Sequence, residues 1–200
     1  MPGLAAPSEQ GGCGFDYRLA MGVTDTWFKL MDLPDEDWPM HWLWHELRNR
    51  RQDERTISYV ESHDQAIVGG QTTAFRLMGN AMYDAMHVDS RNLTVDRGIA
   101  LHKMMRLATL LTAGHGYLTF MGNEFGHPEW VDFPRDGNRW SYHHARRLWS
   151  LRENPRLRYH FLADFDRDML TLVTRERILD RAKPQLLQVD QERKLLAFER

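Results

Sequence analysis

The stretch Arg55-Thr-Ile-Ser-Tyr-Val-Glu-Ser-His-Asp-Gln65 sets the pattern on which the rest of the chain depends. Its first half is rich in β-branched and aromatic side chains, which favours a buried strand. Glu61, His63 and Asp64 follow directly, and such groups are costly to bury without partners. We therefore predict a strand that ends in a polar pocket, although a strand followed by a solvated turn fits this stretch alone equally well.

The composition limits the classes of protein to which the chain can belong. The chain has 200 residues, a net charge of -2, 42% hydrophobic residues and 27% charged residues, which is typical of a soluble globular protein. Charges of both signs are mixed along it, so we expect no nucleic-acid partner. No membrane-length apolar run and no signal-peptide pattern are present, which predicts a cytoplasmic protein without a membrane partner.

Aromatic side chains make up 11% of the chain, and many of them stand next to Gly, Asn, His or Asp. Sugar rings pack their apolar faces on aromatic side chains, while their hydroxyls pair with carboxylates and amides. The composition therefore suits a carbohydrate cleft, although aromatic residues serve more often in a protein core.

The first part of the chain predicts a strand followed by two helices. A short strand is expected within residues 14–20, because apolar and polar side chains alternate there. Thr24 or Asp25 can cap a helix that runs to Met31. A second helix is expected over residues 38–51, after an acidic turn.

The middle of the chain contains the clearest helical pattern. Residues 65–92 are predicted to be mainly irregular, with a short helix within residues 74–86. Asp96 then opens an amphipathic helix, which Gly114 ends. A loop as long as the one before this helix is usually functional when it is rich in aromatic and Met side chains.

The strand-to-loop pattern of the opening stretch occurs a second time. A short apolar strand is expected at residues 115–122, and a loop of polar and aromatic residues follows at 123–130. We predict a helix over residues 141–154 and one or two helices over residues 158–177. Polar side chains thus follow two separate strands.

The order of elements predicts an α/β fold of parallel units. Polar residues directly after strands are found at the active sites of β/α barrels, which need eight strands and about 250 residues. We count three strands with their helices, so residues 1–182 fit part of a (β/α)8 TIM barrel. Residues 183–200 predict the first hairpin of an all-β domain, with its turn near Gln191 and Glu192. A short doubly wound domain is the rival architecture.

Six segments, in the same order along the chain, resemble the eukaryotic-type 1,4-α-glucan (glycogen or starch) branching enzymes of the α-amylase superfamily. These segments are Gly14–Ala20, Tyr59–Gln65, Asp96–Lys103, Gly116–Trp130, Asp132–Arg135 and Phe165–Met169. The resemblance implies that the three strands are the sixth, seventh and eighth of the catalytic barrel, and that an all-β C-terminal domain begins after them.

The resemblance also implies an activity, that of a glycosyltransferase of glycogen or starch biosynthesis that needs no cofactor. Such an enzyme cleaves an α-1,4-glucan (glycogen, amylose or amylopectin) and transfers the freed segment to a 6-hydroxyl with retained configuration. Retention needs one carboxylate as nucleophile and another as general acid and base. A third carboxylate, which stabilises the transition state, aligns with Asp64, and His63 aligns with a histidine that contacts the same sugar. A parent protein from a plant could lie in a plastid.

The nucleophile and the acid/base of this family follow the fourth and fifth strands, and neither motif occurs in these 200 residues. Met1-Pro2 resembles the family sequence just past the acid/base glutamate. We therefore expect that this polypeptide alone has no transferase activity. Two other functions stay open: a non-catalytic α-glucan-binding protein of the same fold, and an unrelated metal-dependent hydrolase.

Asn123, Glu124 and Trp130 are the further candidates for substrate contact. Asn123 and Glu124 end the last strand, where they can touch sugar or orient neighbouring loops. Trp130 can stack on a glucan or fill the core of its own loop. No catalytic role is assigned to Glu61, because other residues are common at that position in the superfamily.

We predict no metal site. His41 and His45 stand one helical turn apart, but no third ligand accompanies them. His143 and His144 meet the same objection. Cys13, the single cysteine, has no evident base partner and cannot form an internal disulfide, which agrees with a reducing compartment.

Overall fold

The computed structural model describes residues 3–51, 54–67, 70–181 and 183–200. The chain divides into two compact units. Unit 1 contains Met1–Val60, Leu107–Leu118 and Leu172–Arg200, and unit 2 contains Glu61–Arg106 and Thr119–Thr171. Helices occur together with a parallel and an antiparallel sheet, which confirms the mixed α/β class. Among the described residues, no helix is both long and apolar enough to cross a membrane.

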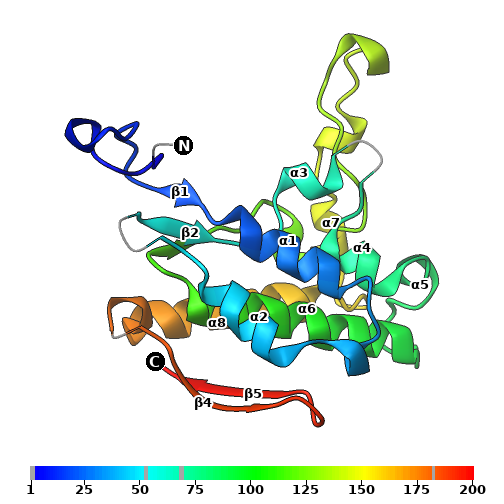
Figure 1. Cartoon of the computed structure of the whole chain (residues 1–200). Coiled ribbons are helices and arrows are strands. Elements are labelled where there is room, and N and C mark those ends of the chain that lie inside the picture. Colours follow the sequence, from blue (N-terminus) through cyan, green and yellow to red (C-terminus); the bar gives the residue numbers. More distant parts are fainter. Residues whose placement is uncertain (1–2, 52–53, 68–69, 182) are drawn as a thin grey trace. The chain divides into compact units, whose positions relative to one another are not determined.

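A small parallel sheet lies in unit 1. Its strands are β1 (Arg18–Leu19), β2 (Thr56–Ser58) and β3 (Gly116–Tyr117), in that order across the sheet (Figure 1). Ile57 of β2 is the register partner of both Leu19 and Gly116. Parallel neighbours need crossover connections, and helices stand between successive strands in the sequence. The predicted strands therefore exist, but each is shorter than its apolar run.

Helix α1 (Met21–Leu30) begins before the predicted cap, so the expectation that Thr24 or Asp25 caps it was wrong. Thr24 lies inside the helix, where its buried hydroxyl donates to the Tyr59 carbonyl at 3.0 Å. Trp27, one turn further along, donates from Nε1 to Thr109 Oγ1 at 2.7 Å. Two side chains of this helix thus donate hydrogen bonds to buried groups of unit 1.

Helix α2 (Met40–Arg48) is shorter than the predicted helix over residues 38–51, because Trp38, which precedes a proline, and Asn49 are both extended. Pro39, at its start, has no side chain that can cap it. Met40, Leu43, Trp44 and Leu47 form its buried face. The first backbone N–H of this helix therefore needs a partner from elsewhere in the chain.

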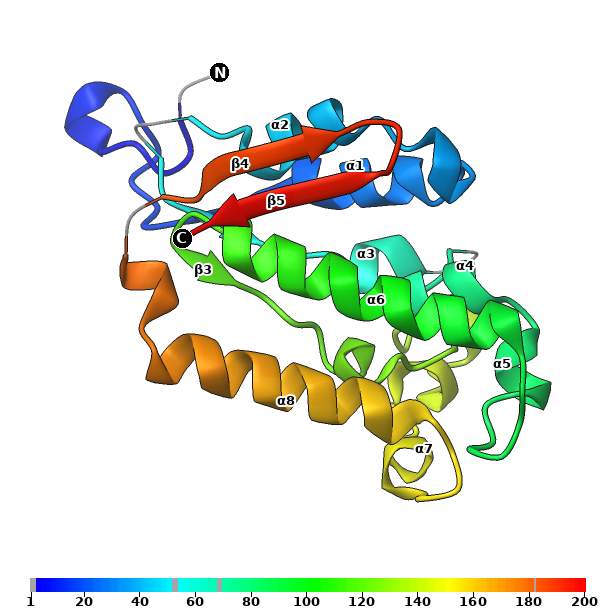
Figure 2. The same cartoon turned by 90° about the horizontal axis from the view of Figure 1, so that it is seen from below.

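The C-terminal hairpin supplies that partner. Strands β4 (Gln185–Asp190) and β5 (Leu195–Glu199) are antiparallel, as the sequence predicts, and lie beside α2 (Figure 2). In the turn between them, Gln191 Oε1 accepts from the backbone N–H of Met40 at 2.8 Å. Its Nε2 donates to the Trp38 carbonyl at 3.0 Å. Lys194, at the end of the same turn, also donates from Nζ to the Trp38 carbonyl at 3.1 Å. Two side chains of the turn therefore fix the hairpin to the start of α2.

Unit 2 is built mainly of helices. They are α3 (His63–Ala66), α4 (Thr73–Met78), α5 (Ala81–Asp84), α7 (Trp149–Glu153) and most of α6 (Leu93–Thr112) and α8 (Tyr159–Arg175). The predicted long helices exist as α6 and α8. Helix α6 begins three residues before Asp96, because the Asn92 side chain accepts from the backbone N–H of Val95 at 3.1 Å.

The described chain also contains short 3-10 helices. They are Ser8–Gln10, Asp35–Asp37, Asn123–Phe125, Asp136–Asn138, His143–Ala145 and Ile178–Asp180.

The predicted helix over residues 141–154 was wrong. The structure has the 3-10 turn His143–Ala145, an extended link, and then α7. Arg147 lies in the link, is buried, and donates from Nη2 to the His144 carbonyl at 2.8 Å. A buried guanidinium is costly without hydrogen-bond partners. The extended link lets Arg147 keep these partners, and this requirement overrides the local preference for a helix.

Replacing Gln191 should loosen the hairpin. We expect Gln191→Ala to lower the free energy of unfolding by about 1 kcal/mol, because the Met40 N–H loses its partner, whereas the Trp38 carbonyl keeps its bond from Lys194. Urea unfolding of the 200-residue chain measures this difference. Glu192→Ala, an exposed change in the same turn, is the control and should stay within about 0.5 kcal/mol of the wild type. Equal effects of the two changes would contradict the capping role.

Candidate functional site

The first half of the candidate site begins after β2, in unit 2. Ser62 caps α3: its Oγ accepts from the backbone N–H of Asp64 at 3.3 Å, and Gln65 Oε1 accepts from the Ser62 N–H at 2.8 Å. This reciprocal pair is a capping box. It places His63 and Asp64 in the first turn of a short helix.

His63 and Asp64 contact each other, with His63 Nε2 3.1 Å from Asp64 Oδ1. The side chain of Asp64 is 55% exposed and that of His63 is 41% exposed. The rings of Phe120 and Phe133 lie 5.6 and 5.7 Å from the His63 ring. The imidazole is thus held by aromatic contacts, while the carboxylate stays open to a ligand.

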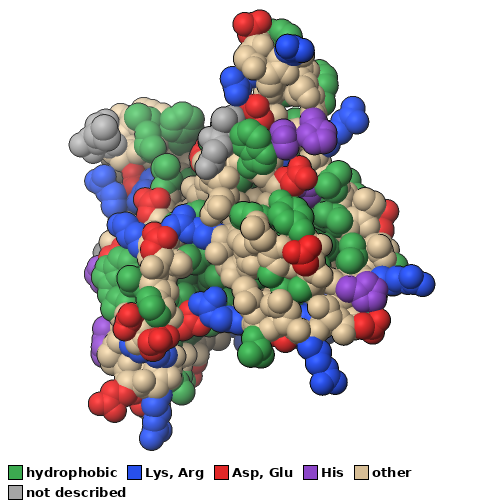
Figure 3. Space-filling view, turned by 90° about the vertical axis from the view of Figure 1, so that its right-hand side faces the viewer, with side chains coloured by type: hydrophobic (Ala, Val, Ile, Leu, Met, Phe, Trp, Pro, Cys, Tyr) green, Lys and Arg blue, Asp and Glu red, His purple; other side chains and the backbone are tan. Residues whose placement is uncertain are grey.

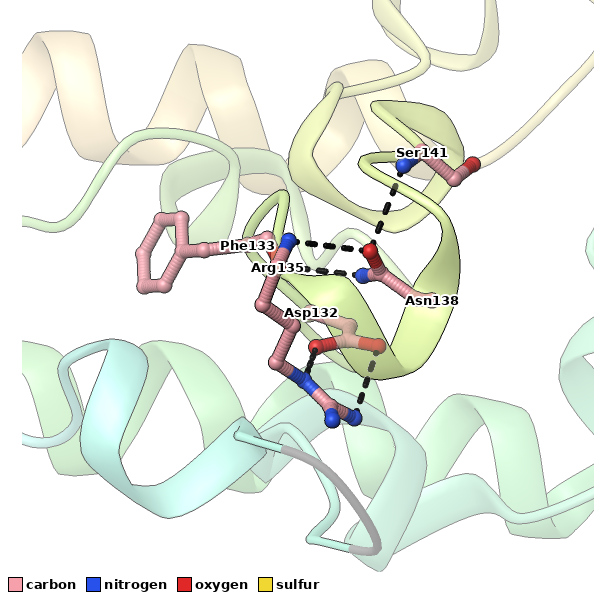
Figure 4. A network of polar contacts seen from close by, with 5 residues as sticks. All are labelled: Asp132, Phe133, Arg135, Asn138 and Ser141. Atoms are coloured by element: carbon pink, nitrogen blue, oxygen red, sulfur yellow. Dashed lines mark hydrogen bonds and ion pairs between the residues drawn. The ribbon is translucent and has the colours of Figure 1, made fainter.

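Phe133 belongs to a loop with its own polar framework (Figure 4). Arg135 donates from Nε to Asp132 Oδ1 at 2.9 Å and from Nη2 to Oδ2 at 3.4 Å, and this pairing lowers the pKa of the Asp132 carboxyl. Asn138 Oδ1 accepts from the backbone N–H groups of Arg135 and Ser141, at 3.0 and 3.2 Å. The segment Asp132–Arg135 therefore shapes the loop that carries Phe133 to His63.

Glu61 has a different environment from Asp64, although only three residues separate them. Its carboxylate is buried and accepts from the backbone N–H of Thr73 at 2.7 Å, at the start of α4. Burial raises the pKa of Glu61 to about 7, while the Thr73 hydrogen bond and the charge of Arg106 act in the opposite direction. Glu61 thus ties the segment before α3 to α4.

His102 in α6 is the second buried titratable group near Arg106. Burial lowers the pKa of its imidazole to about 3, and the positive charges of Arg106 and Lys103 add to this effect. The imidazole is therefore neutral in the folded protein at neutral pH.

The residues expected after the last strand have unequal surroundings. Asn123 is 3% exposed, and Glu124 Oε2 accepts from the backbone N–H of Gly122 at 2.7 Å within its own turn. Gly122 has a φ of 95°, a conformation that favours glycine. Trp130 is half-buried, with its ring 4.6 Å from that of His144.

Trp130 lines a pocket of about 350 Å³. The other lining residues are Gly70, Gln71, Phe75, Tyr83, Pro128, Glu129 and His144. Tyr83, Pro128 and Glu129 also line an adjoining pocket of about 300 Å³ whose walls include Met82, Met86 and Tyr159. Sequence reasoning did not identify Phe75 and Tyr83, whose only signal was the aromatic content of residues 65–92.

Known proteins from animals, fungi and plants align with the whole chain. The chain is 52% identical to the 1,4-alpha-glucan-branching enzyme of Felis catus and 51% identical to that of Rhizophagus irregularis. It is 46% identical to the chloroplastic/amyloplastic enzyme of this name from Oryza sativa subsp. japonica. Over its whole length the chain is thus similar, at about 50% identity, to proteins of plants, animals and fungi that are all named 1,4-alpha-glucan-branching enzyme.

This result confirms the resemblance of the six sequence segments. The chain spans 29%, 30% and 25% of the lengths of these three branching enzymes, in the order given. No protein-family model matches the chain.

Replacing Glu61 should change how stability depends on pH. The folded-state pKa of about 7 lies above the ordinary value of 4.5, so the folded chain holds an extra proton between these values. This advantage is full below pH 4.5 and is lost as the pH rises to about 7. We expect the free energy of unfolding of Glu61→Gln, minus that of the wild type, to rise by about 3 kcal/mol over this range.

The comparison is made by urea unfolding at several pH values between about 4 and 8. His102 acts in the opposite direction, since its lowered pKa costs stability as the pH falls, but it contributes equally to both proteins and cancels in the difference. Glu153→Gln, at an exposed position, is the matched control and should follow the wild type. A difference that stays constant with pH would show that the pKa of Glu61 in the folded chain is not raised above its ordinary value.

Proposed function

We propose that this branching-enzyme chain supplies the transition-state-stabilising part of an active site that forms α-1,6 branches. The observation that carries this proposal is the Asp64 carboxylate, which is open to solvent, fixed in the first turn of α3 and paired with His63. The names of the relatives support the reaction class. The enzyme would cleave an α-1,4-glucan and transfer the segment to a 6-hydroxyl.

Asp64 would act through its charge and its hydrogen bonds. A fixed carboxylate stabilises the positive charge that develops on the sugar during glycosyl transfer, and it accepts hydrogen bonds from the sugar hydroxyls. His63 restrains this carboxylate through Nε2 and presents an imidazole edge to the same sugar. The aromatic contacts of Phe120 and Phe133 limit the freedom of the imidazole.

Retention of configuration needs two further carboxylates, a nucleophile and an acid/base. We assign these to the ends of the fourth and fifth barrel strands, whose motifs do not occur in these 200 residues. The isolated chain would then bind glucan without transferring it.

The same proposal extends to the architecture. Strands β1, β2 and β3 would be the sixth, seventh and eighth strands of a (β/α)8 barrel, in agreement with their parallel order. Residues 1–182 would belong to this barrel and residues 183–200 would begin an all-β domain, as the antiparallel pairing of β4 and β5 supports.

Asn123, Glu124 and Trp130 complete the proposed site. The inward position of Asn123 and the bond from Gly122 to Glu124 support a role in orienting the loop, whereas Trp130 lines a pocket and can stack on sugar. We propose a cytoplasmic enzyme. The name of the Oryza relative supports a plastid as the alternative.

The test uses a chimera in which this chain replaces the matching segment of the Felis catus branching enzyme. We expect the chimera to branch amylose, and Asp64→Asn to lower its rate by about 10²–10³-fold. Asp89→Asn, which changes a carboxylate that is 87% exposed, is the control and should leave the rate unchanged. Iodine staining and the release of chains by a debranching enzyme measure the product.

Two outcomes would contradict parts of the proposal. Full activity of the Asp64→Asn chimera would exclude the role of this carboxylate. Branching of amylose by the isolated 200-residue chain would show that it does not lack the nucleophile and the acid/base.

A second candidate function is α-glucan binding without turnover. The pocket of about 350 Å³ favours it, because Phe75, Tyr83 and Trp130 supply aromatic faces while Gln71 and Glu129 supply polar groups. Aromatic faces and a few polar groups are the usual composition of a sugar site.

We expect the isolated chain to bind maltoheptaose and Trp130→Ala to weaken this binding by about tenfold, the loss of one aromatic contact. Isothermal titration calorimetry measures the affinity. Trp140→Ala removes an exposed tryptophan outside this pocket and should leave the affinity unchanged. Equal affinities of the wild type and Trp130→Ala would exclude the pocket as the glucan site.

A further inference from the structure

Glu129, His143 and His144 come together in unit 2 on the folded chain. One ligand atom from each, a carboxylate oxygen and two imidazole nitrogens, lies within 4.8 Å of the other two. Figure 3 shows a face on which histidine side chains gather beside acidic and hydrophobic ones. No third ligand for the His143–His144 pair could be recognised in the sequence, because Glu129 is distant from the pair along the chain.

The distances suit a tetrahedral ion. His144 Nδ1 lies 3.4 Å from Glu129 Oε2, and two ligands that are each about 2.1 Å from a zinc ion at the tetrahedral angle are about 3.4 Å apart. The rings of His143 and His144 are perpendicular, with centroids 4.6 Å apart. His143 is exposed, and its ligand nitrogen lies within 4.8 Å of the ligand atoms of the other two residues.

The backbone holds two of these residues in place. Arg147 donates from Nη2 to the His144 carbonyl at 2.8 Å and from Nη1 to the Glu129 carbonyl at 3.4 Å. The His127 ring nitrogen Nδ1 lies 3.3 Å from the same Glu129 carbonyl. Because one buried guanidinium binds both carbonyls, the two ligands keep their spacing without help from an ion.

His144 Nδ1 also lacks a hydrogen-bond partner among the described residues, although this atom is shielded from solvent. A shielded polar atom without a partner is costly. An Nδ1–H group would relieve this cost by donating to Glu129 Oε2, 3.4 Å away. In the other neutral tautomer Nδ1 carries a lone pair, and a bound cation relieves the cost there, because the neutral imidazole is the form that coordinates metals.

We propose that Glu129, His143 and His144 bind a divalent transition-metal ion, with Zn²⁺ as the preferred ion. Two imidazoles and one carboxylate are a ligand set that zinc accepts, with the fourth position left to water. Glu129 and His144 also line the pocket of about 350 Å³, so that position adjoins it. The ion would join the segment around Trp130 to the turn His143–Ala145 and hold the Trp130 ring against His144.

The test measures binding of Zn²⁺ to the 200-residue chain after treatment with a chelator. We expect saturable binding of one ion per chain in calorimetry. Each of Glu129→Gln, His143→Asn and His144→Asn should weaken it by about tenfold or more. The double variant His41→Asn/His45→Asn is the matched control, because it removes the other closely spaced histidine pair and should leave the affinity unchanged.

A second readout separates loss of ligands from loss of folding. Co²⁺ bound in tetrahedral geometry gives visible absorption bands, which we expect in the wild type and in the His41/His45 control but not in the three ligand variants. Circular dichroism verifies that each variant is folded. Loss of binding in the His41/His45 variant, unchanged binding in Glu129→Gln, or no saturable binding by the wild type would each overturn the proposal.

Discussion

Buried arginines determine how the segments of unit 2 are joined. A guanidinium stays charged when it is shielded from water, so it must keep acceptors around it. Arg106 in α6 donates from Nε to Asp166 in α8 at 2.9 Å and from Nη2 to Thr119 Oγ1 at 3.0 Å. One side chain therefore joins three segments that are distant in the sequence, and it also lies near enough to Glu61 to affect its pKa.

Arg147 and Arg158 also join distant segments of unit 2, mainly through hydrogen bonds to backbone carbonyls. Arg147 binds the carbonyls of Glu129 and His144, while Arg158 binds the Ser90 carbonyl and the Asp96 carboxylate. Loops with little regular structure are thus fixed to the body of unit 2. This explains how the segment that carries Trp130 and Glu129 can form a defined pocket wall without belonging to a helix or a strand.

Glu61 and Asp64 lie in different surroundings, and this difference suits them to different roles. Both acids follow the same strand. Glu61 is buried and accepts a hydrogen bond from the backbone N–H of Thr73 at the start of α4, whereas Asp64 is exposed beside His63. Burial raises the pKa of Glu61, and its carboxylate is already hydrogen-bonded, whereas the exposed carboxylate of Asp64 is open to a ligand. The difference supports the choice of Asp64 as the ligand-binding carboxylate and of Glu61 as a structural one.

The sequence by itself determined the alternation of strands and helices, the long helices α6 and α8, the C-terminal hairpin and the position of His63 and Asp64 directly after a strand. These features depend on periodicity, capping and turn residues, which act over a few positions. Tertiary structure alone decided that residues 141–154 do not form one helix, that Phe75 and Tyr83 share a pocket with Trp130, and that Glu129 reaches His143 and His144. Those outcomes depend on the hydrogen bonds of buried side chains such as Arg147 to distant carbonyls, which leave no periodic pattern in a sequence.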